Sequence, residues 1–401
     1  MKNQDITLSM IDMVKLAVIV SGAILTGCKM GPNFHPPEAP KTTSYTPSPA
    51  LSHTKQAPSS TKGKAQHFRY NQYISKSWWT VFHSQALNSL IQKGLQNNPT
   101  VEMSQSSLRS AQANLLATIG PSLFPTISTQ FSGNHERTNL LAAGINLAQT
   151  PGASAVTLDN PFNLYNTSIG VSYNLDVFGG TRRQLESLHA EIEHQYFELE
   201  ATYLTLTANI VTSAITIASL KAQIRTTEEL IDCQQKWLRV TRNNYKLGHT
   251  TRLEVLTREN RLNETQASLP PLKDNLTKKT NALSVLIGTL PSESHIPNLQ
   301  LEELHLPTQL PVSLPSMFVR QRPDIRSAES LLHKASAEIG VATANIFPKF
   351  VLAANYGWNG TLITQLFSPA NVLWNYGGQV AQTLFQGGGI NSKEKSCHCK
   401  F

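Results

Sequence analysis

Residues 196–245, YFELEATYLTLTANIVTSAITIASLKAQIRTTEELIDCQQKWLRVTRNNY, carry the pattern that decides the fold of this chain. An apolar or aromatic residue recurs there at every seventh position: Tyr196, Tyr203, Ile210, Ile217, Ile224, Ile231, Leu238 and Tyr245. A companion series, broken at Ser213, consists of Leu185, Ile192, Leu199, Leu206 and Leu220. Two apolar series with a seven-residue period form the seam of a coiled coil. The sequence therefore predicts one long helix that packs against a partner along one side.

This predicted helix covers residues 181–247 and would be about 100 Å long at 1.5 Å per residue. A globular domain does not need such a helix, so we expect it to cross a wide aqueous space. Gly248 follows the helix and favours a left-handed C-cap. A second helix is expected to return over residues 252–287, with a kink at Pro270-Pro271. Together these elements predict a helical hairpin whose tip lies at Gly248.

Four segments outside the hairpin alternate between apolar and polar residues with the period of a β-strand. They lie at residues 127–132, 169–177, 350–358 and 374–384. Segments of about ten residues with one polar and one apolar face fit transmembrane strands, and they also fit a soluble β-sandwich. The leader described below and the surrounding helices favour the membrane interpretation. Because the smallest single-chain barrels have about eight strands, four spanning strands require several chains to share one barrel.

The two pairs of strands belong to two similar halves of the chain. Asn98-Pro99, an Ala/Ser-rich helix and Phe124-Pro125 in the first half correspond to Arg322-Pro323, an Ala-rich helix and Phe347-Pro348 in the second. The shift of about 224 residues is far longer than a solenoid repeat, which indicates a duplicated half-domain. Pro99 and Pro323 each suit the first turn of a helix, where a missing N–H has no consequence.

The N-terminus has the features of a lipoprotein signal peptide over residues 1–27. Residues 16–24, LAVIVSGAI, form a short apolar core after Lys15, and Leu25-Thr26-Gly27-Cys28 ends it like a bacterial lipobox. We therefore predict that Cys28 is acylated and anchored in membrane lipid; an ordinary cleavage site or a buried free thiol is the alternative. Met13 would give a cleaner leader than Met1. Residues 28–77, rich in Pro, Ser, Thr and Lys, are expected to form an extended tether.

Composition limits the classes of function. Charged residues make up 15% of the chain and the net charge of +8 is scattered, which does not support nucleic-acid binding. No run of 18 apolar residues follows the leader, which excludes a bundle of transmembrane helices. No catalytic motif or phosphate-binding loop is present, so we expect no enzyme and no cofactor. Cys397-His398-Cys399 is a weak metal-binding candidate on a terminal tail, and Cys233 is interpreted as an inert residue.

In combination, these pieces resemble the TolC-like outer-membrane efflux channels, in the lipoprotein branch that serves proton-driven tripartite pumps. The resemblance covers about Gly27 to Gly388. It is carried by these motifs: Cys28–Pro37 (CKMGPNFHPP, with Phe34 where that branch usually has Tyr), Trp78-Trp79 with Phe82 and Leu87, Asn97-Asn98-Pro99, Leu175–Gly179 (LDVFG), Tyr245–Gly248 (YKLG) with Leu253–Leu256 (LEVL), Arg320–Ile325 (RQRPDI), and Leu384–Gly388 (LFQGG).

The resemblance implies an α+β membrane fold: a homotrimer with a shared β-barrel and a long periplasmic coiled-coil barrel, built from two repeats per chain. It implies an outer-membrane location, a periplasmic adaptor (membrane fusion) protein and an inner-membrane proton-driven transporter as partners, and export of drugs or other small toxic solutes. The hairpin tip, with Gly248, Thr250 and Thr251, would contact the adaptor. An outer channel for metal-ion efflux or for protein secretion is the alternative within this class.

The resemblance predicts residues 78–300 as the first channel repeat and residues 301–389 as the start of a second. Residues 390–401, INSKEKSCHCKF, lack the apolar heptads of a second hairpin. We interpret this segment as an aberrant tail and expect a truncated channel with impaired function. A non-functional channel remnant is therefore a further alternative, and no gate residues can be assigned.

Overall fold

The computed structural model describes residues 29–38, 41, 51–55, 65–70, 72–137, 161–293, 295–304, 306–313, 315–385 and 387. These residues form two compact units, and each unit takes segments from both halves of the chain. One unit holds residues 37–110 and 192–330 and is helical apart from two short strands. The other holds residues 1–36, 111–191 and 331–401 and contains the main sheet. Cys28 and the tail at 390–401 lie outside the described residues.

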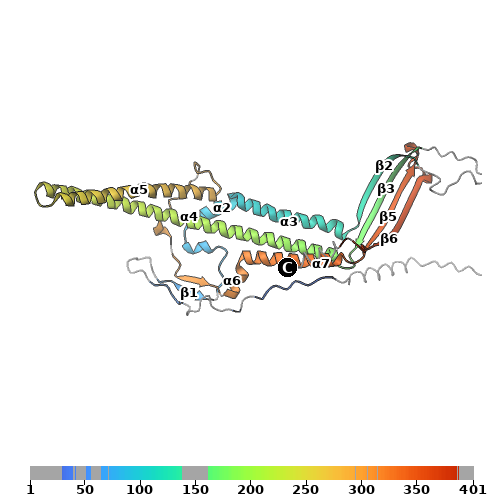
Figure 1. The fold of residues 1–401 in the computed structure, drawn as a ribbon, viewed down its shortest axis with the longest axis horizontal. Coiled ribbons are helices and arrows are strands. Elements are labelled where there is room, and N and C mark those ends of the chain that lie inside the picture. The colour runs from blue at the N-terminus through green and yellow to red at the C-terminus, as the bar shows by residue number, and fades with distance from the viewer. Residues whose placement is uncertain are drawn as a thin grey trace, which may run out of the picture. The chain divides into compact units, whose positions relative to one another are not determined.

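The predicted hairpin is present. Helix α4 extends over Gly180–Lys246, 67 residues, and α5 over Arg252–Leu286, with Pro270 and Pro271 inside it. Figure 1 shows the two helices side by side up to the turn that joins them. Among the described residues, α4 is the one helix whose length and composition would allow a part of it to span a membrane. Its Ile210 and Ile217 are almost fully buried in the core of the helical unit, as expected for a coiled-coil seam.

Helix α2 (Gln85–Asn97) supplies a third side of that core. The core consists of Leu87, Leu90, Ile91, Val101, Leu206, Ile210, Val211, Ala214, Ile217, Ala218, Leu283, Ile287 and Leu299. Ser84 caps α2 by accepting a hydrogen bond from the Leu87 amide. The Asn98 side chain donates to the Leu286 carbonyl at 2.9 Å and accepts from the Thr100 amide at 2.9 Å. Asn98 therefore ties the end of α5 to the junction that follows α2.

The two halves of the chain use the same order of elements. After α2 come α3 (Pro99–Leu123), β2 (Thr126–Glu136) and β3 (Phe162–Leu175). In the second half, α6 (Pro315–Gln321) corresponds to α2 and α7 (Pro323–Ala344) to α3. Strands β5 (Lys349–Gly360) and β6 (Val372–Ala381) correspond to β2 and β3. As predicted, Pro99 and Pro323 are the first residues of their helices.

The four long strands form one antiparallel sheet in the order β2-β3-β5-β6 (Figure 1). Strand β3 ends at Leu175, two residues before the predicted end. Asp176 instead accepts hydrogen bonds from the amides of Thr181 and Arg182, both at 3.0 Å, and so caps the start of α4. Strand β6 ends at Ala381, three residues before Leu384, and begins at Val372, two residues earlier than predicted.

A small second sheet joins the segment that we expected to be an extended tether to a strand more than 200 residues later in the chain. Strand β1 (His67–Tyr70) pairs in parallel with β4 (Gln309–Val312). Each strand has only four residues and no clear alternation, which explains why the pattern did not reveal them. Short 3₁₀ helices complete the fold at Trp78–Phe82, Leu301–Glu303, Ile363–Gln365 and Pro369–Asn371.

Candidate functional site

One face of the main sheet is apolar and exposed. In β2 and β3 this face carries Ile127, Phe131 and Ile169, which are 70%, 61% and 50% exposed. In β5 and β6 it carries Leu352, Tyr356, Trp374, Tyr376 and Val380, all exposed. Strand register puts these residues on one side, because Tyr356 lies opposite both Ile169 and Trp374. A continuous exposed apolar face of this size marks a surface that contacts lipid or protein.

The opposite face of the same sheet is polar. Ser128 on β2 lies opposite Gly170 on β3, which lies opposite Asn355 on β5, which lies opposite Asn375 on β6. Directly opposed residues in a sheet share a face, so this row crosses the whole sheet on its polar side. A sheet with one apolar and one polar face separates two environments.

Strands β2 and β6 form the two edges of this sheet. In the part of the chain that the structure describes, each of them pairs on one side only. The outer side of each edge strand therefore presents a row of N–H and C=O groups for a further strand. In a bilayer an unpaired backbone group costs several kcal/mol, so the sheet needs a neighbouring sheet at both edges.

The tip of the hairpin has the predicted turn. Gly248 has φ of +77°, the left-handed conformation that glycine adopts without strain, and the His249 amide donates to the Asn244 carbonyl at 2.8 Å. Thr251 caps α5 by accepting from the Glu254 amide at 3.3 Å. The Thr250 hydroxyl donates to the Glu254 carboxylate at 2.6 Å. The threonine side chains thus stabilise the turn, while Gly248 is left exposed.

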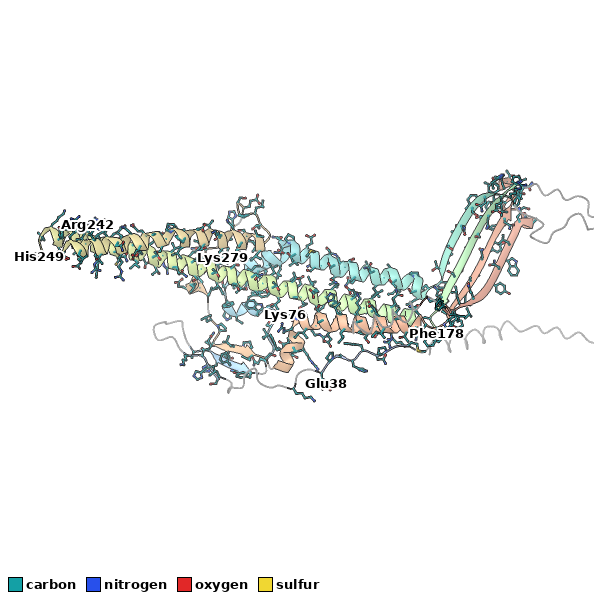
Figure 2. All side chains as sticks on the ribbon, viewed as in Figure 1. Glu38, Lys76, Phe178, Arg242, His249 and Lys279 are labelled. Carbon is teal, nitrogen blue, oxygen red and sulfur yellow. The ribbon has the colours of Figure 1, made fainter. Side chains whose placement is uncertain are left out.

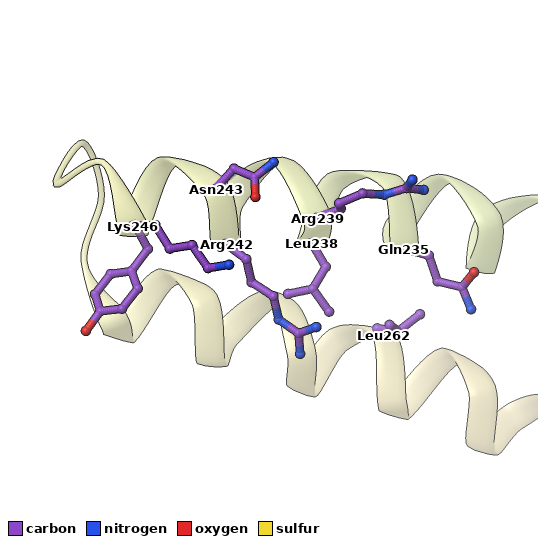
Figure 3. Close-up of a pocket in the computed structure, with 8 residues that line it drawn as sticks. Gln235, Leu238, Arg239, Arg242, Asn243, Lys246 and Leu262 are labelled. Carbon is purple, nitrogen blue, oxygen red and sulfur yellow. The ribbon is translucent and has the colours of Figure 1, made fainter.

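A basic groove lies beside this tip, between α4 and α5. It has a volume of about 620 Å³ and is lined by Gln235, Leu238, Arg239, Arg242, Asn243, Tyr245, Lys246 and Leu262 (Figure 3). Figure 2 places Arg242 and His249 at this end of the hairpin. Arg242 pairs with Glu259 at 3.1 Å, whereas Arg239 and Lys246 form no ion pair with any described residue. The groove therefore favours an acidic group on a partner.

The segment that follows Cys28 is held by a buried arginine at the start of α4. Arg183 is 1% exposed, and its guanidinium donates to the carbonyls of Met30 and Gly31, both at 2.9 Å, and to Oδ1 of Asn33 at 3.0 Å. Gly31 has φ of +86°, and a Cβ there would overlap the backbone of Gly340. Only glycine fits this contact.

Glu186 completes an N-terminal clamp, which we define as Arg183 and Glu186 together with the segment Lys29–Asn33 that they hold. Its carboxylate accepts from Arg183 at 2.9 Å, from Lys29 at 2.7 Å and from His333 at 3.1 Å. Burial opposes ionisation of this carboxyl, but the hydrogen bonds from Lys29, His333 and Arg183 outweigh it and lower its pKa to about 2. The His333 ring also stacks on Phe34, with 4.6 Å between ring centroids.

The sequence did not reveal the clamp. Arg183, Glu186 and His333 are polar residues on helices, which usually indicates no more than a solvated face. Their partners lie about 150 residues away in the chain, so no local spacing predicts the contact. The structure thus gives a physical role to the CKMGPNF motif that the resemblance had only matched. Among the described residues, no cluster of three His, Cys, Asp or Glu side chains could hold a metal ion.

A sheet with one lipid-compatible face and two open edges, joined to a coiled-coil hairpin, defines an outer-membrane channel protein. The comparisons assign the family. The family model described as outer membrane efflux protein matches residues 90–289 and 314–396, and the chain belongs to this family. It is therefore a protein of the bacterial outer membrane.

Individual relatives agree with this assignment. The chain is 29% identical over 383 residues to the probable efflux pump outer membrane protein TtgC of Pseudomonas putida, covering 94% of this chain and 73% of TtgC. It is 23% identical over 382 residues to the cation efflux system protein CusC of Escherichia coli, covering 93% and 74%. Its fold is similar to the solved outer-membrane channel OprN, with a TM-score of 0.76, 24% identity and coverage of 93% and 77%.

Proposed function

We propose that this chain works as the outer-membrane channel of a tripartite efflux system, a passive conduit through which drugs or other small toxic solutes leave the cell. The observation that carries the proposal is the two-faced sheet with unpaired edges on β2 and β6. Such a sheet is stable in a bilayer only when further copies close it into a barrel.

Strand number favours a homotrimer. Two copies of the four-stranded sheet would make a barrel of eight strands, whose interior side chains fill. Three copies make twelve strands, which is the smallest shared barrel with room for an open lumen. The resemblance independently implies a trimer. Cross-linking of purified protein in native lipid tests this number directly, and a dimer or a monomer as the largest species would contradict it.

Acylation of Cys28 would anchor each copy in the outer membrane. The lipobox supports this, and so does the N-terminal clamp, which holds Met30 and Gly31 close behind the predicted lipid. Labelling of cells with a fatty-acid analogue should mark the protein, and Cys28→Ala should abolish the label. Cys233→Ala serves as the matched control and should leave the label unchanged. Labelling that persists in Cys28→Ala would contradict the prediction.

The hairpin tip would bind the periplasmic adaptor protein. Gly248, Thr250 and Thr251 are small residues of the turn between α4 and α5, and the basic groove next to them offers Arg239 and Lys246 to acidic residues of the partner. A photo-cross-linker attached at Thr250→Cys should capture the adaptor. The same cross-linker at Gln130→Cys on β2 is the control, and capture of the adaptor only from that position would contradict the assignment.

The cargo would be delivered by an inner-membrane proton-driven transporter that the adaptor connects to this channel. Efflux of metal ions is the second candidate, because the relative CusC is named for cation efflux. No described residue distinguishes the two cargo classes. Drug and metal-ion resistance of the same strain should therefore be measured together.

The test is expression in cells that lack their own outer-membrane channel, with and without a second hairpin added after Gly388. Restored resistance to a toxic organic solute supports drug efflux, and restored resistance to metal ions alone supports the second candidate. Val171→Pro, which removes a hydrogen bond from the central strand β3, should abolish the rescue, whereas Val171→Ile should not. No rescue by either version would contradict the proposal and favour a non-functional remnant.

A further inference from the structure

The polar face of the main sheet is almost free of charge. Of all residues in β2, β3, β5 and β6, only Glu136 and Lys349 carry a full charge at neutral pH. Glu136 is the last residue of β2, and Lys349 is the first residue of β5. Both therefore lie at ends of the sheet, and no charged side chain lies along the length between them.

Strand register shows what this face offers instead. Three rows of opposed residues cross the sheet, and their side chains are hydroxyls, amides, hydrogen or the apolar groups of Ala353 and Leu373. The rows are Thr126, Ser172, Ala353 and Gly377; Ser128, Gly170, Asn355 and Asn375; and Gln130, Ser168, Gly357 and Leu373. Hydroxyl and amide groups both donate and accept hydrogen bonds, so they solvate a cation, an anion or a neutral polar solute without a fixed preference.

In a barrel of several copies, each lining residue occurs once per copy and forms a ring. A ring of carboxylates or of ammonium groups in a narrow pore focuses a potential of several kT and selects ions by the sign of their charge. A ring of serine or asparagine creates no such potential. The composition of the polar face therefore determines how charged solutes experience the lumen.

We propose that the strand-built lumen of this channel does not select solutes by charge, and that it admits cations, anions and neutral polar molecules alike. This inference rests on the proposed function, because it requires that the polar face line the lumen of a shared barrel. It defines the solutes that this part of the channel admits by their size and not by their charge. Any preference for one sign of charge must then arise outside the strands.

The reaction of single cysteines with charged reagents tests the inference without a conducting channel. The probes are a cationic and an anionic methanethiosulfonate of similar size, applied to the full chain in outer-membrane vesicles. The background carries Cys233→Ser, Cys397→Ser and Cys399→Ser. Ser168→Cys places the thiol in the middle of the polar face, and Ile169→Cys, the next residue, is the matched control on the apolar face.

We expect Ser168→Cys to react with both reagents and Ile169→Cys to react with neither. The ratio of the cationic to the anionic rate, divided by the same ratio for free cysteine in solution, should lie within about twofold of one. Asn355 lies on the neighbouring strand β5, two residues from Gly357, which is opposite Ser168. Adding Asn355→Asp should raise this ratio about fivefold or more, and Asn355→Lys should lower it to a similar extent.

Two other results would overturn the inference, and they differ from each other. If Ser168→Cys alone reacts but its normalised ratio departs from one by tenfold or more, the barrel exists and its lumen is charged. If the two cysteines react equally, or neither reacts, the polar face does not line a lumen. The proposed function then fails, and the inference fails with it.

Discussion

The main sheet and the helical hairpin differ most clearly in where they hold charge. The four long strands carry charge only at Glu136 and Lys349, whereas the hairpin carries ion pairs along its length, such as Lys273 with Glu228 at 2.8 Å and Arg242 with Glu259 at 3.1 Å. A charged side chain facing lipid is costly, but the same side chain on a helix in water is solvated. The difference indicates that the two regions fold in different solvents.

The largest expected effect comes from placing a charge inside the hairpin core. Ile210→Asp would put an unpaired carboxylate at a fully buried position and remove a large apolar side chain. We expect the free energy of unfolding to fall by about 5 kcal/mol. Urea unfolding followed by circular dichroism at 222 nm would measure this. Gln223→Asp, exposed on the same helix, should change it by less than about 0.5 kcal/mol, and equal effects of both variants would contradict the assigned core.

A buried charge is stable on α4 when all its hydrogen bonds are formed, as at Arg183. Arg183→Met keeps much of the side-chain volume, but the carbonyls of Met30 and Gly31 lose the hydrogen bonds from the guanidinium and Glu186 loses one of its three donors. We expect the clamp to lose about 3–5 kcal/mol, because several hydrogen bonds from one charged and buried donor are lost together. Hydrogen exchange of the Met30 amide should become faster. Arg326→Met, at a partly exposed ion pair, is the control and should leave this rate unchanged.

These two positions also show what the sequence can predict. The heptad series predicted α4 at 181–247 and the structure has it at Gly180–Lys246, because burial repeats along the helix and leaves a periodic signal. The glycine turn at Gly248 follows from an equally local rule, and alternation located all four strands, although β3 begins at Phe162 and not at the predicted residue 169. Arg183 leaves no such signal, since its partners depend on chain segments brought together only by the fold. The parallel pairing of β1 with β4 escaped prediction for the same reason.

The two faces of the sheet should respond differently to the same new charge. Ile169→Lys places an ammonium group on the apolar face, and we expect a loss of about 2–4 kcal/mol when this face lies near the middle of a bilayer. Ser168→Lys places it on the polar face and should have a small effect. Urea titration of protein folded into liposomes would compare the two. A larger loss for Ser168→Lys would mean that the faces are assigned in reverse.

The clamp also predicts a dependence on pH. Because the folded pKa of Glu186, about 2, lies below that of a free glutamate, the stabilisation is present above about pH 4.5 and is lost as pH falls towards 2. Partial exposure to water reduces it to about 1–2 kcal/mol. Exchange of the Met30 amide, compared between pH 6 and pH 3 after correction for intrinsic rates, should show this loss. In Glu186→Gln the dependence should be much weaker, and an unchanged dependence would assign it to another group.

The smallest expected effect concerns the hairpin tip. Thr251→Ala removes the N-cap of α5 and should destabilise the turn by about 1 kcal/mol. Thr251→Ser keeps the accepting oxygen and should be close to neutral. Amide exchange at the start of α5 would distinguish the two variants. If both variants were neutral, the cap would not contribute to the turn, and Thr251 would be available for other contacts.

The position of the clamp has a consequence for how deeply the protein sits in the membrane. The Met30 amide donates to the carbonyl of Phe178, at the junction between β3 and α4, and Arg183 holds the Met30 carbonyl. Two residues of extended chain reach at most about 7 Å. Acyl chains on Cys28 would therefore enter the bilayer within about 7 Å of this junction. Such an anchor would fix the depth of the sheet in the membrane, because the strands could not shift along the membrane normal without pulling the acyl chains out of the lipid or breaking the hydrogen bonds of Arg183.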